Sequence, residues 1–158
     1  MEPYIRRAEP SDTNELLRLL EQIAEHHRQG RPDIFKQNVR KYSAEELASM
    51  LQDKDRPVFV AEDGHKGISG YVFCIRETCR GHAVFQDRDT LYMDDFCVDK
   101  NARGQSIGKK LFDAVKDYAR SQSIFHLELN VWEFNEGAIR FYQRCGFTTQ
   151  KRHMEIQL

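Results

Sequence analysis

The sequence predicts a single α/β domain with a mostly antiparallel central sheet, one parallel strand pair and flanking helices. Three observations lead to this fold class. The chain of 158 residues is long enough for one domain, residues 1–158, with its own core. Its strand-like segments first follow one another as a meander and then alternate with helices. No internal repeat or low-complexity segment interrupts that order.

The first third of the chain is expected to hold one strand and two helices. Tyr4–Arg6 is a short strand candidate, and Ser11 or Asp12 caps the helix after it. Residues 26–42 are polar, are broken by glycine and proline, and are expected to form a loop. Its cluster of Lys36, Arg40 and Lys41 is interpreted as a solvated face. Ser43 and Glu46 form a capping box for the second helix.

The remaining elements follow from hydrophobic periodicity. We expect strands at Pro57–Ala61, Ile68–Ile75, Leu91–Val98, His126–Val131 and Thr148–Gln157. A turn around Asp63-Gly64 joins the first two, and a polar loop spans Thr78–Asp89. We expect helices from Ile107 to about Ser121 and over Glu136–Cys145, the second ending at Gly146.

Composition excludes several classes of function. The 24 basic and 25 acidic side chains nearly cancel, so no nucleic-acid partner is expected. The apolar runs are too short to span a membrane, and no secretory signal precedes them. Cys74, Cys79, Cys97 and Cys145 lack zinc-site spacing, so we expect no metal and a reducing, cytoplasmic location.

The stretch from Leu91 to Leu111 carries the chemistry. A buried strand, a turn with Gly104 and a helix point backbone N–H groups at the helix N-terminus, which suits a phosphate. The carboxylates Asp94 and Asp95 precede this turn. Neither the Walker nor the dinucleotide glycine spacing is present. An ordinary glycine-containing turn therefore stays open as the alternative.

Two motifs in this order resemble the GNAT superfamily of acetyl-CoA-dependent N-acetyltransferases. Arg103-x-x-Ser106-x-Gly108 is similar to the family's pyrophosphate motif, Arg/Gln-x-x-Gly-x-Gly/Ala, with serine in place of the first glycine. Residues 135–147 resemble its second block, Asn-x-x-Ala-x-x-x-Tyr-x-x-x-Gly-Phe. With the first strand and helix, the resemblance covers most of the chain. It implies a GNAT fold, in which the parallel strand pair is splayed, and acetyl-CoA as co-substrate.

The resemblance also implies roles for single residues. The pantetheine arm of acetyl-CoA would pair with the backbone of Phe96, Cys97 and Val98. Its pyrophosphate would bind N–H groups of Arg103, Gly104, Gln105, Ser106, Ile107, Gly108 and Lys109. Asn135, Ala138 and Tyr142 share one helical face toward the cofactor. Tyr142 matches the family's general acid, and its alternative is an ordinary half-buried tyrosine.

Residues 92–98, YMDDFCV, further resemble the Tyr-Leu-Glu-Asp-Phe-Phe-Val strand of diamine acetyltransferases of the spermidine/spermine type. That likeness implies Asp94 as the base and Asp95 as the group that binds the cationic substrate, although the reverse assignment stays open. The alternative is that one of the pair only forms a salt bridge with Arg76 or Lys100. Cys97 is interpreted as a buried thiol rather than an acetyl-carrying nucleophile.

The function predicted from these features is acetyl transfer from acetyl-CoA to a primary amine of a small molecule, directly in a ternary complex. A polyamine-like or other cationic amine is the expected substrate class. Acetylation of a protein N-terminus or lysine is the second hypothesis, and an acyl-CoA-binding module without turnover is the third. A homodimer is a further expectation. His26 and His27 are interpreted as solvent-facing.

Overall fold

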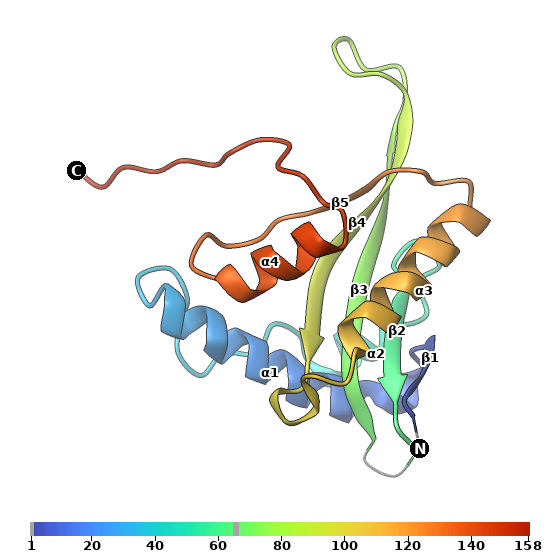
Figure 1. Ribbon diagram of the computed structural model, residues 1–158, viewed down its shortest axis with the longest axis vertical. Helices are drawn as coiled ribbons and strands as arrows, with labels where there is room; N and C mark the ends of the chain where they lie inside the picture. The colour runs from blue at the N-terminus through green and yellow to red at the C-terminus, as the bar shows by residue number, and fades with distance from the viewer. Residues whose placement is uncertain (1, 65–66) are drawn as a thin grey trace.

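The computed structural model describes residues 2–64 and 67–158. Five strands form one sheet in chain order, as Figure 1 shows: β1 (Tyr4–Arg7), β2 (Val58–Glu62), β3 (Ile68–Cys79), β4 (Arg88–Val98) and β5 (Leu127–Leu129). The first four pair antiparallel, and β5 pairs parallel with β4. The predicted fold class is confirmed, with a mixed sheet flanked by helices.

Helices cover both faces of this sheet. They are α1 (Thr13–Gly30), α2 (Ala44–Met50), α3 (Ile107–Ser121) and α4 (Glu136–Arg144), with short 3-10 turns at Pro10–Asp12 and Lys100–Ala102. The predicted capping box begins α2, because Ser43 accepts from the Glu46 N–H and Glu46 accepts from the Ser43 N–H. Helices α1 and α2 pack on one face, and α3 packs on the other (Figure 1).

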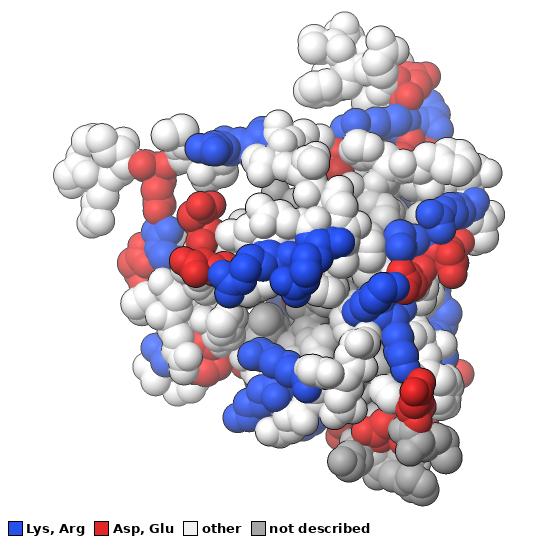
Figure 2. All heavy atoms as spheres, in the orientation of Figure 1, with Lys and Arg blue, Asp and Glu red and all other residues white. Residues whose placement is uncertain are grey.

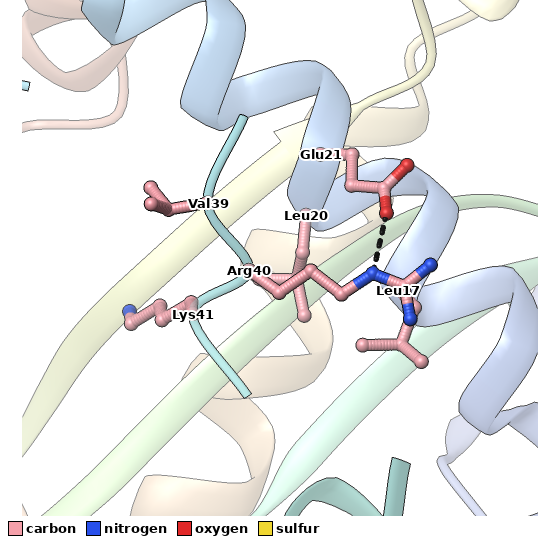
Figure 3. A pocket seen from close by; sticks show the side chains of 6 residues that line it. All are labelled: Leu17, Leu20, Glu21, Val39, Arg40 and Lys41. Carbon is pink, nitrogen blue, oxygen red and sulfur yellow. Dashed lines mark hydrogen bonds and ion pairs between the residues drawn. The ribbon is translucent and has the colours of Figure 1, made fainter. Parts of the chain in front are cut away.

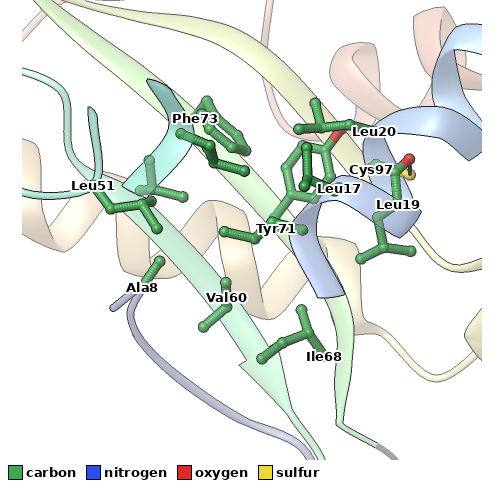
Figure 4. Close-up of a cluster of buried hydrophobic side chains, with 13 residues drawn as sticks. Ala8, Leu17, Leu19, Leu20, Leu51, Val60, Ile68, Tyr71, Phe73 and Cys97 are labelled. Atoms are coloured by element: carbon green, nitrogen blue, oxygen red, sulfur yellow. Dashed lines mark hydrogen bonds between the residues drawn. The ribbon is translucent and has the colours of Figure 1, made fainter. Parts of the chain in front are cut away.

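Two clusters of buried side chains make up the core. The first, here called the α1 core, joins α1 and α2 to β2 and β3, with Tyr71 fully buried within it (Figure 4). The second, the α3 core, joins α3 to the opposite face of the sheet, with Leu111 and Val115 fully buried. Side chains of α4, including Tyr142, pack at the edge of the α3 core.

Strand β4 contains a β-bulge. Phe73 of β3 pairs with Asp95 and its neighbour Cys74 pairs with Met93, so Asp94 is the extra residue between them. Side chains normally alternate between the two faces of a strand, and one extra residue reverses the alternation. Met93 accordingly lies in the α3 core, whereas Cys97 lies in the α1 core.

Several predicted boundaries were wrong. Helix α1 continues to Gly30 through part of the expected loop at residues 26–42, and the Phe134 ring packs directly on Gly30 where a side chain would otherwise stand. Strands β3 and β4 extend into the expected Thr78–Asp89 loop and leave only residues 80–87 between them. The turn at Asp63-Gly64 leads into residues 65–66, which lie outside the described residues.

The predicted strand at Thr148–Gln157 is not present. These residues are extended and exposed, and Figure 1 shows them running from α4 past the sheet to a free end. Met154 and Ile156 are 86% and 84% exposed. Alternating apolar residues favour a strand only when a neighbouring strand supplies the hydrogen bonds, and β5 beside this segment is only three residues long.

Candidate active site

The bulge brings two carboxylates to the same side of β4. The Lys41 Nζ lies 3.3 Å from an Asp94 oxygen and 3.1 Å from an Asp95 oxygen. Neighbouring residues of a regular strand point to opposite faces, so one ammonium could not reach both. The bulge at Asp94 therefore builds a paired-carboxylate site out of two consecutive residues.

Asp95 is the more firmly held of the pair. Its side chain is 11% exposed, against 29% for Asp94. The buried Tyr71 hydroxyl donates a hydrogen bond of 2.9 Å to the second Asp95 oxygen. Burial raises the pKa of Tyr71 well above its usual value, and the Asp95 charge adds to this, so Tyr71 remains a donor. Asp94 keeps the freer carboxylate.

The cation that pairs with Asp94 and Asp95 is neither Arg76 nor Lys100, the two that the sequence suggested. Arg76 instead pairs with Asp89, 3.2 Å away, and the described ion pairs of Asp94 and Asp95 are both with Lys41. Lys41 is still 42% exposed, as its interpretation as part of a solvated face expects, but its ammonium also binds both carboxylates. Burial opposes its charge, but Asp95 and Asp94 together hold the pKa of Lys41 well above its ordinary value.

Tyr142 lies on α4, half-buried among aromatic rings. Its ring centroid is 6.1 Å from that of Phe96 and 5.7 Å from that of Phe147. Burial raises the pKa of Tyr142, and the negative charge of Asp95 raises it further. The hydroxyl is thus protonated at neutral pH, and it makes no hydrogen bond to any other residue that the structure describes. It is available to a bound molecule.

The edge of β4 that faces β5 opens beyond the bulge. Pairing with β5 covers Leu91 to Met93, and within the described residues β4 continues to Val98 without a further partner on that side. Backbone groups of Phe96 to Val98 thus lie on an open strand edge, which can accept an extended amide chain. This is the segment that the resemblance assigns to the pantetheine arm.

The N-terminus of α3 follows this edge. Ser106 precedes the helix in a left-handed conformation, with φ 58° and ψ 17°, and its side chain does not cap the helix. Gly104 also has positive φ, at 81°. The N–H groups of the first helical turn therefore lack a side-chain acceptor, as an anion site requires. The residues present fit a pyrophosphate here.

Gly108 and Lys109, in the first turn of α3, both have close neighbours within the protein. A Cβ on Gly108 would lie 3.2 Å from the Phe141 ring, so the close neighbour of this glycine is α4. Lys109 pairs with Asp113 at 2.6 Å, one turn along the helix. Both residues can still offer backbone N–H groups to an anion.

Basic side chains gather on the same face. Figure 2 shows them over α4 and over the segment between β4 and α3, with a hollow between the two groups. Helix α4 contains Arg140 and Arg144, and the segment contains Lys100 and Arg103. A phosphate-bearing ligand lying in that hollow would meet positive charge from both sides.

Helix α4 begins with Asn135. The side chain of Asn135 accepts a hydrogen bond of 3.4 Å from the Ala138 N–H, so it caps the helix. Asn135, Ala138 and Tyr142 are all partly buried, as the shared helical face predicts. The structure thus gives Asn135 a local role in starting the helix that carries Tyr142.

An aromatic cluster lies near the carboxylates. The Phe35 ring lies 5.3 Å from His27 and 5.1 Å from Trp132, and Phe134 packs near both histidines. Burial lowers the pKa of His27, while the charge of Asp95 acts in the opposite direction. His26 is exposed as expected, although its ring also lies near Phe134, whereas His27 is partly buried, so the expectation of a solvent-facing side chain was wrong for His27.

Sequence reasoning missed Lys41, Tyr71 and this cluster. Lys41 and Phe35 belong to an irregular segment, and its sequence has no hydrophobic periodicity from which its place in the fold could be predicted. Tyr71 lies in a buried strand run, where its alternation with Val72 indicates only that it is internal. In the structure Tyr71 pairs with Cys97, two residues from Asp95. A correct prediction of the register between these two strands would have placed Tyr71 beside the site.

Within the described ranges, no group of three or more His, Cys, Asp or Glu side chains is arranged to hold a metal ion. None of the described helices combines the length and the apolar character needed to cross a membrane.

Comparison with known proteins agrees with this geometry. The model of the acetyltransferase (GNAT) family matches residues 17–147. A crystal structure of a tetramutant of protein BH1408 from Bacillus halodurans superposes with a TM-score of 0.93 and 34% identity, covering 98% of this chain and 99% of that one. An aminoglycoside acetyltransferase from an uncultured soil sample shares the fold, at a TM-score of 0.75 and 22% identity over 99% and 96% of the two chains.

Curated relatives match over shorter stretches. An uncharacterized N-acetyltransferase of Methanocaldococcus jannaschii is 34% identical over 98 residues, 62% of this chain and 41% of that protein. A probable spermine N(1)-acetyltransferase of Bacillus subtilis subsp. natto is 36% identical over 58 residues, 36% of this chain and 38% of that protein. The chain thus spans about two fifths of the length of these relatives. The family match, together with the fold, establishes that this chain belongs to the GNAT family of acetyltransferases.

Proposed function

We propose that the protein transfers an acetyl group from acetyl-CoA to the primary amine of a small cationic molecule. The observation that carries this proposal is the bulge in β4. It sets two carboxylates beside an open strand edge, and Tyr142 packs against Phe96 of the same strand. An amine acceptor, an acetyl donor and a proton donor can meet there.

Asp94 is the proposed base. A primary amine with a lysine-like pKa of about 10.4 is mostly protonated at neutral pH and must lose a proton before it attacks the thioester carbonyl. Asp94 is more exposed than Asp95 and is not held by Tyr71, so it can take that proton directly or through water. Asp95, which Tyr71 holds, is the proposed anchor for the substrate ammonium.

Tyr142 is the proposed acid. As the new C–N bond forms and the C–S bond breaks, the thiolate of coenzyme A needs a proton. Burial and the charge of Asp95 keep the Tyr142 hydroxyl protonated, which suits a donor. The transfer then proceeds in one ternary complex, without an acetyl-enzyme. Burial raises the pKa of the Cys97 thiol to about 12, which argues against Cys97 as a nucleophile.

The acetyl-CoA site is proposed along β4 and α3. Acetyl-CoA supplies the acetyl group when bound. The backbone edge of Phe96, Cys97 and Val98 would bind the pantetheine amides, the N–H groups of Arg103 to Lys109 would bind the pyrophosphate, and α4 from Asn135 to Tyr142 would cover the arm.

The surroundings favour a small cationic acceptor. The acidic pair attracts an ammonium, and the Phe35, Trp132 and Phe134 rings offer faces over which cations and alkyl chains pack well. The spermine acetyltransferase relative acts on such a molecule by its name. An N-alpha-acetyltransferase 30 of Schizosaccharomyces pombe, 33% identical over 94 residues, makes a protein N-terminus the second candidate.

An amine panel tests this proposal, with release of the coenzyme A thiol as the readout. It contains spermidine, an aminoglycoside, N-α-blocked lysine and a short peptide with a free N-terminus. Turnover with the first two and little with the peptide supports the proposal, and the reverse pattern favours protein acetylation. Acetyl-CoA binding by calorimetry without transfer to any amine would indicate a binding module.

We also propose that the chain forms a homodimer through residues 148–158. Met154 and Ile156 alternate with polar residues and are almost fully exposed, and β5 has an open edge nearby. A second copy presents the same edge, so two copies can exchange these segments symmetrically. A dimer by light scattering that becomes a monomer in a Met154→Lys, Ile156→Lys variant supports this, whereas a monomeric native chain at high concentration contradicts it.

The four cysteines are all unpaired in the structure. Because disulfides are rare in reducing compartments, this pattern fits the cytoplasm, which we propose as the location.

A further inference from the structure

Lys41 lies at the position where the amine acceptor needs to bind. We propose that its ammonium is an internal substitute for the acceptor ammonium, and that a cationic acceptor binds by displacing Lys41 from Asp94 and Asp95. This inference rests on the proposed function for the identity of the displacing molecule. It makes Lys41 a residue that determines which acceptors can enter.

The contacts leave little room for a second cation. One Asp95 oxygen accepts from Tyr71 at 2.9 Å and the other accepts from Lys41 at 3.1 Å. The same Lys41 Nζ lies 3.3 Å from Asp94. Both oxygens of the anchor carboxylate are therefore occupied within the protein itself. An incoming ammonium can form close pairs with both carboxylates only after the Lys41 side chain has left.

The segment that carries Lys41 is held lightly on one side of this residue. Figure 3 shows Arg40 reaching Glu21 on α1, while the Lys41 side chain extends in another direction. The Arg40–Glu21 pair is 3.0 Å long, but its side chains are 66% and 52% exposed, and exposed ion pairs contribute little because water screens them. On the other side, Tyr42 packs against the α1 core and stacks on Phe73. Lys41 can therefore leave the carboxylates by rotating its own partly exposed side chain, while Tyr42 stays in place.

The exchange keeps the site's charge balanced. One ammonium leaves the two carboxylates as another arrives, so the pair is never left unneutralised in a half-buried site. A neutral acceptor offers no such compensation. The two carboxylates hold the pKa of Lys41 well above its ordinary value, so the internal competitor remains charged throughout the physiological pH range.

Calorimetric titration with spermidine, in the presence of saturating coenzyme A, tests the inference without turnover. Lys41→Met removes the competitor and should bind spermidine at least about tenfold more tightly than the native chain. Lys41→Arg keeps a cation in place and should stay close to native affinity. Lys36→Met is the matched control, since Lys36 is an exposed lysine of the same segment, and it should also stay close to native affinity.

Equal or weaker spermidine binding by Lys41→Met would overturn the inference. A native chain that binds spermidine but acetylates no amine would refute the proposed function and leave this comparison intact. A second measurement uses only the native fold. The side-chain ammonium signal of Lys41 in nitrogen-15 spectra, assigned through Lys41→Arg, should move when spermidine is added. A signal that does not move at saturation would also overturn the inference.

Discussion

Asp94 and Asp95 are consecutive residues of β4, yet both carboxylates lie within 3.3 Å of a single nitrogen, the Nζ of Lys41. The extra residue in β4 is the cause, because it turns the second carboxylate to the side of the first. The two are not equivalent, since Tyr71 holds only Asp95. This asymmetry is the basis for proposing Asp94 as the base and Asp95 as the anchor, and it makes each proposed role testable.

Replacing the base should slow the reaction without loosening the fold. Asp94→Asn keeps the size of the side chain but cannot take a proton, so we expect kcat to fall by about 10²–10⁴-fold. Asp95→Asn should mainly raise KM for the amine. Asp89→Asn is the control, because Asp89 pairs with Arg76 and Arg80 at the far end of β4. A native rate and pH profile in Asp94→Asn would remove Asp94 from the mechanism.

Tyr142→Phe should retain the fold and the binding of acetyl-CoA, since the ring packs among Phe96, Phe141 and Phe147 and the hydroxyl does not contribute to that packing. Without the hydroxyl the thiolate has no proton donor. We expect kcat to fall by about 10²-fold or more. Thiol release measures the rate, and calorimetry measures the affinity for acetyl-CoA. Full turnover in a folded variant would exclude the acid role.

Ser106→Gly should stabilise the protein. A serine at φ 58° carries a steric cost that glycine does not, on the order of 1 kcal/mol. Urea unfolding should show this increase in the free energy of unfolding. Gly104→Ala, at φ 81° in the same turn, is the opposite control and should lose a similar amount. No gain in Ser106→Gly would mean that the serine side chain compensates for its backbone strain.

Gly108→Ala should destabilise the protein by about 1–3 kcal/mol, because the new Cβ would lie 3.2 Å from the Phe141 ring and 3.7 Å from that of Phe96. Gly137→Ala in α4 meets open space and is the matched control. Alanine is the better helix former there, so this variant should gain up to about 1 kcal/mol. Thermal unfolding of both variants compares the two effects. Equal stability would show that Phe141 can move aside.

The pair of Arg6 and Asp12 should make stability depend on acid pH. Arg6 donates two hydrogen bonds of 2.8 Å to the Asp12 carboxylate, which lowers the pKa of Asp12 below its ordinary value of 3.8. Because the pKa of Asp12 is lower in the folded than in the unfolded state, the pair stabilises the fold fully at neutral pH. This stabilisation is lost as the pH falls below 3.8 and through the folded pKa of Asp12. Asp12→Asn should cost about 1–3 kcal/mol at pH 7. The difference from the native chain should shrink near pH 2.

The sequence predicted the framework well because periodicity reports burial. The order of strands and helices, and the parallel pairing of β4 with β5, followed from the runs around Val58, Leu91 and Ile107. The predicted ends of helices and strands were wrong where contacts between distant residues are involved. Helix α1 runs through residues that by themselves favour a loop, and it ends at Gly30, on which the distant Phe134 packs.

The site was only partly predictable for the same reason. Motifs singled out Asp94, Asp95 and Tyr142 as candidates, and in the structure Tyr142 packs against Phe96, the residue that follows Asp95. Lys41 was not found, because its partners lie more than fifty residues away and its own segment has no pattern. The left-handed backbone of Ser106 was visible only as an unusual residue in a glycine position.

The extra residue in β4 also has a consequence for how the chain can vary. If Asp94 were deleted, Met93 and Asp95 would become neighbours opposite Cys74 and Phe73, so β4 would become a regular strand in its present register. Leu91 and Met93 would still face the α3 core, and Cys97 would still face the α1 core. The loss of this single codon would therefore remove one carboxylate of the pair without turning any buried residue of β4 to the other face.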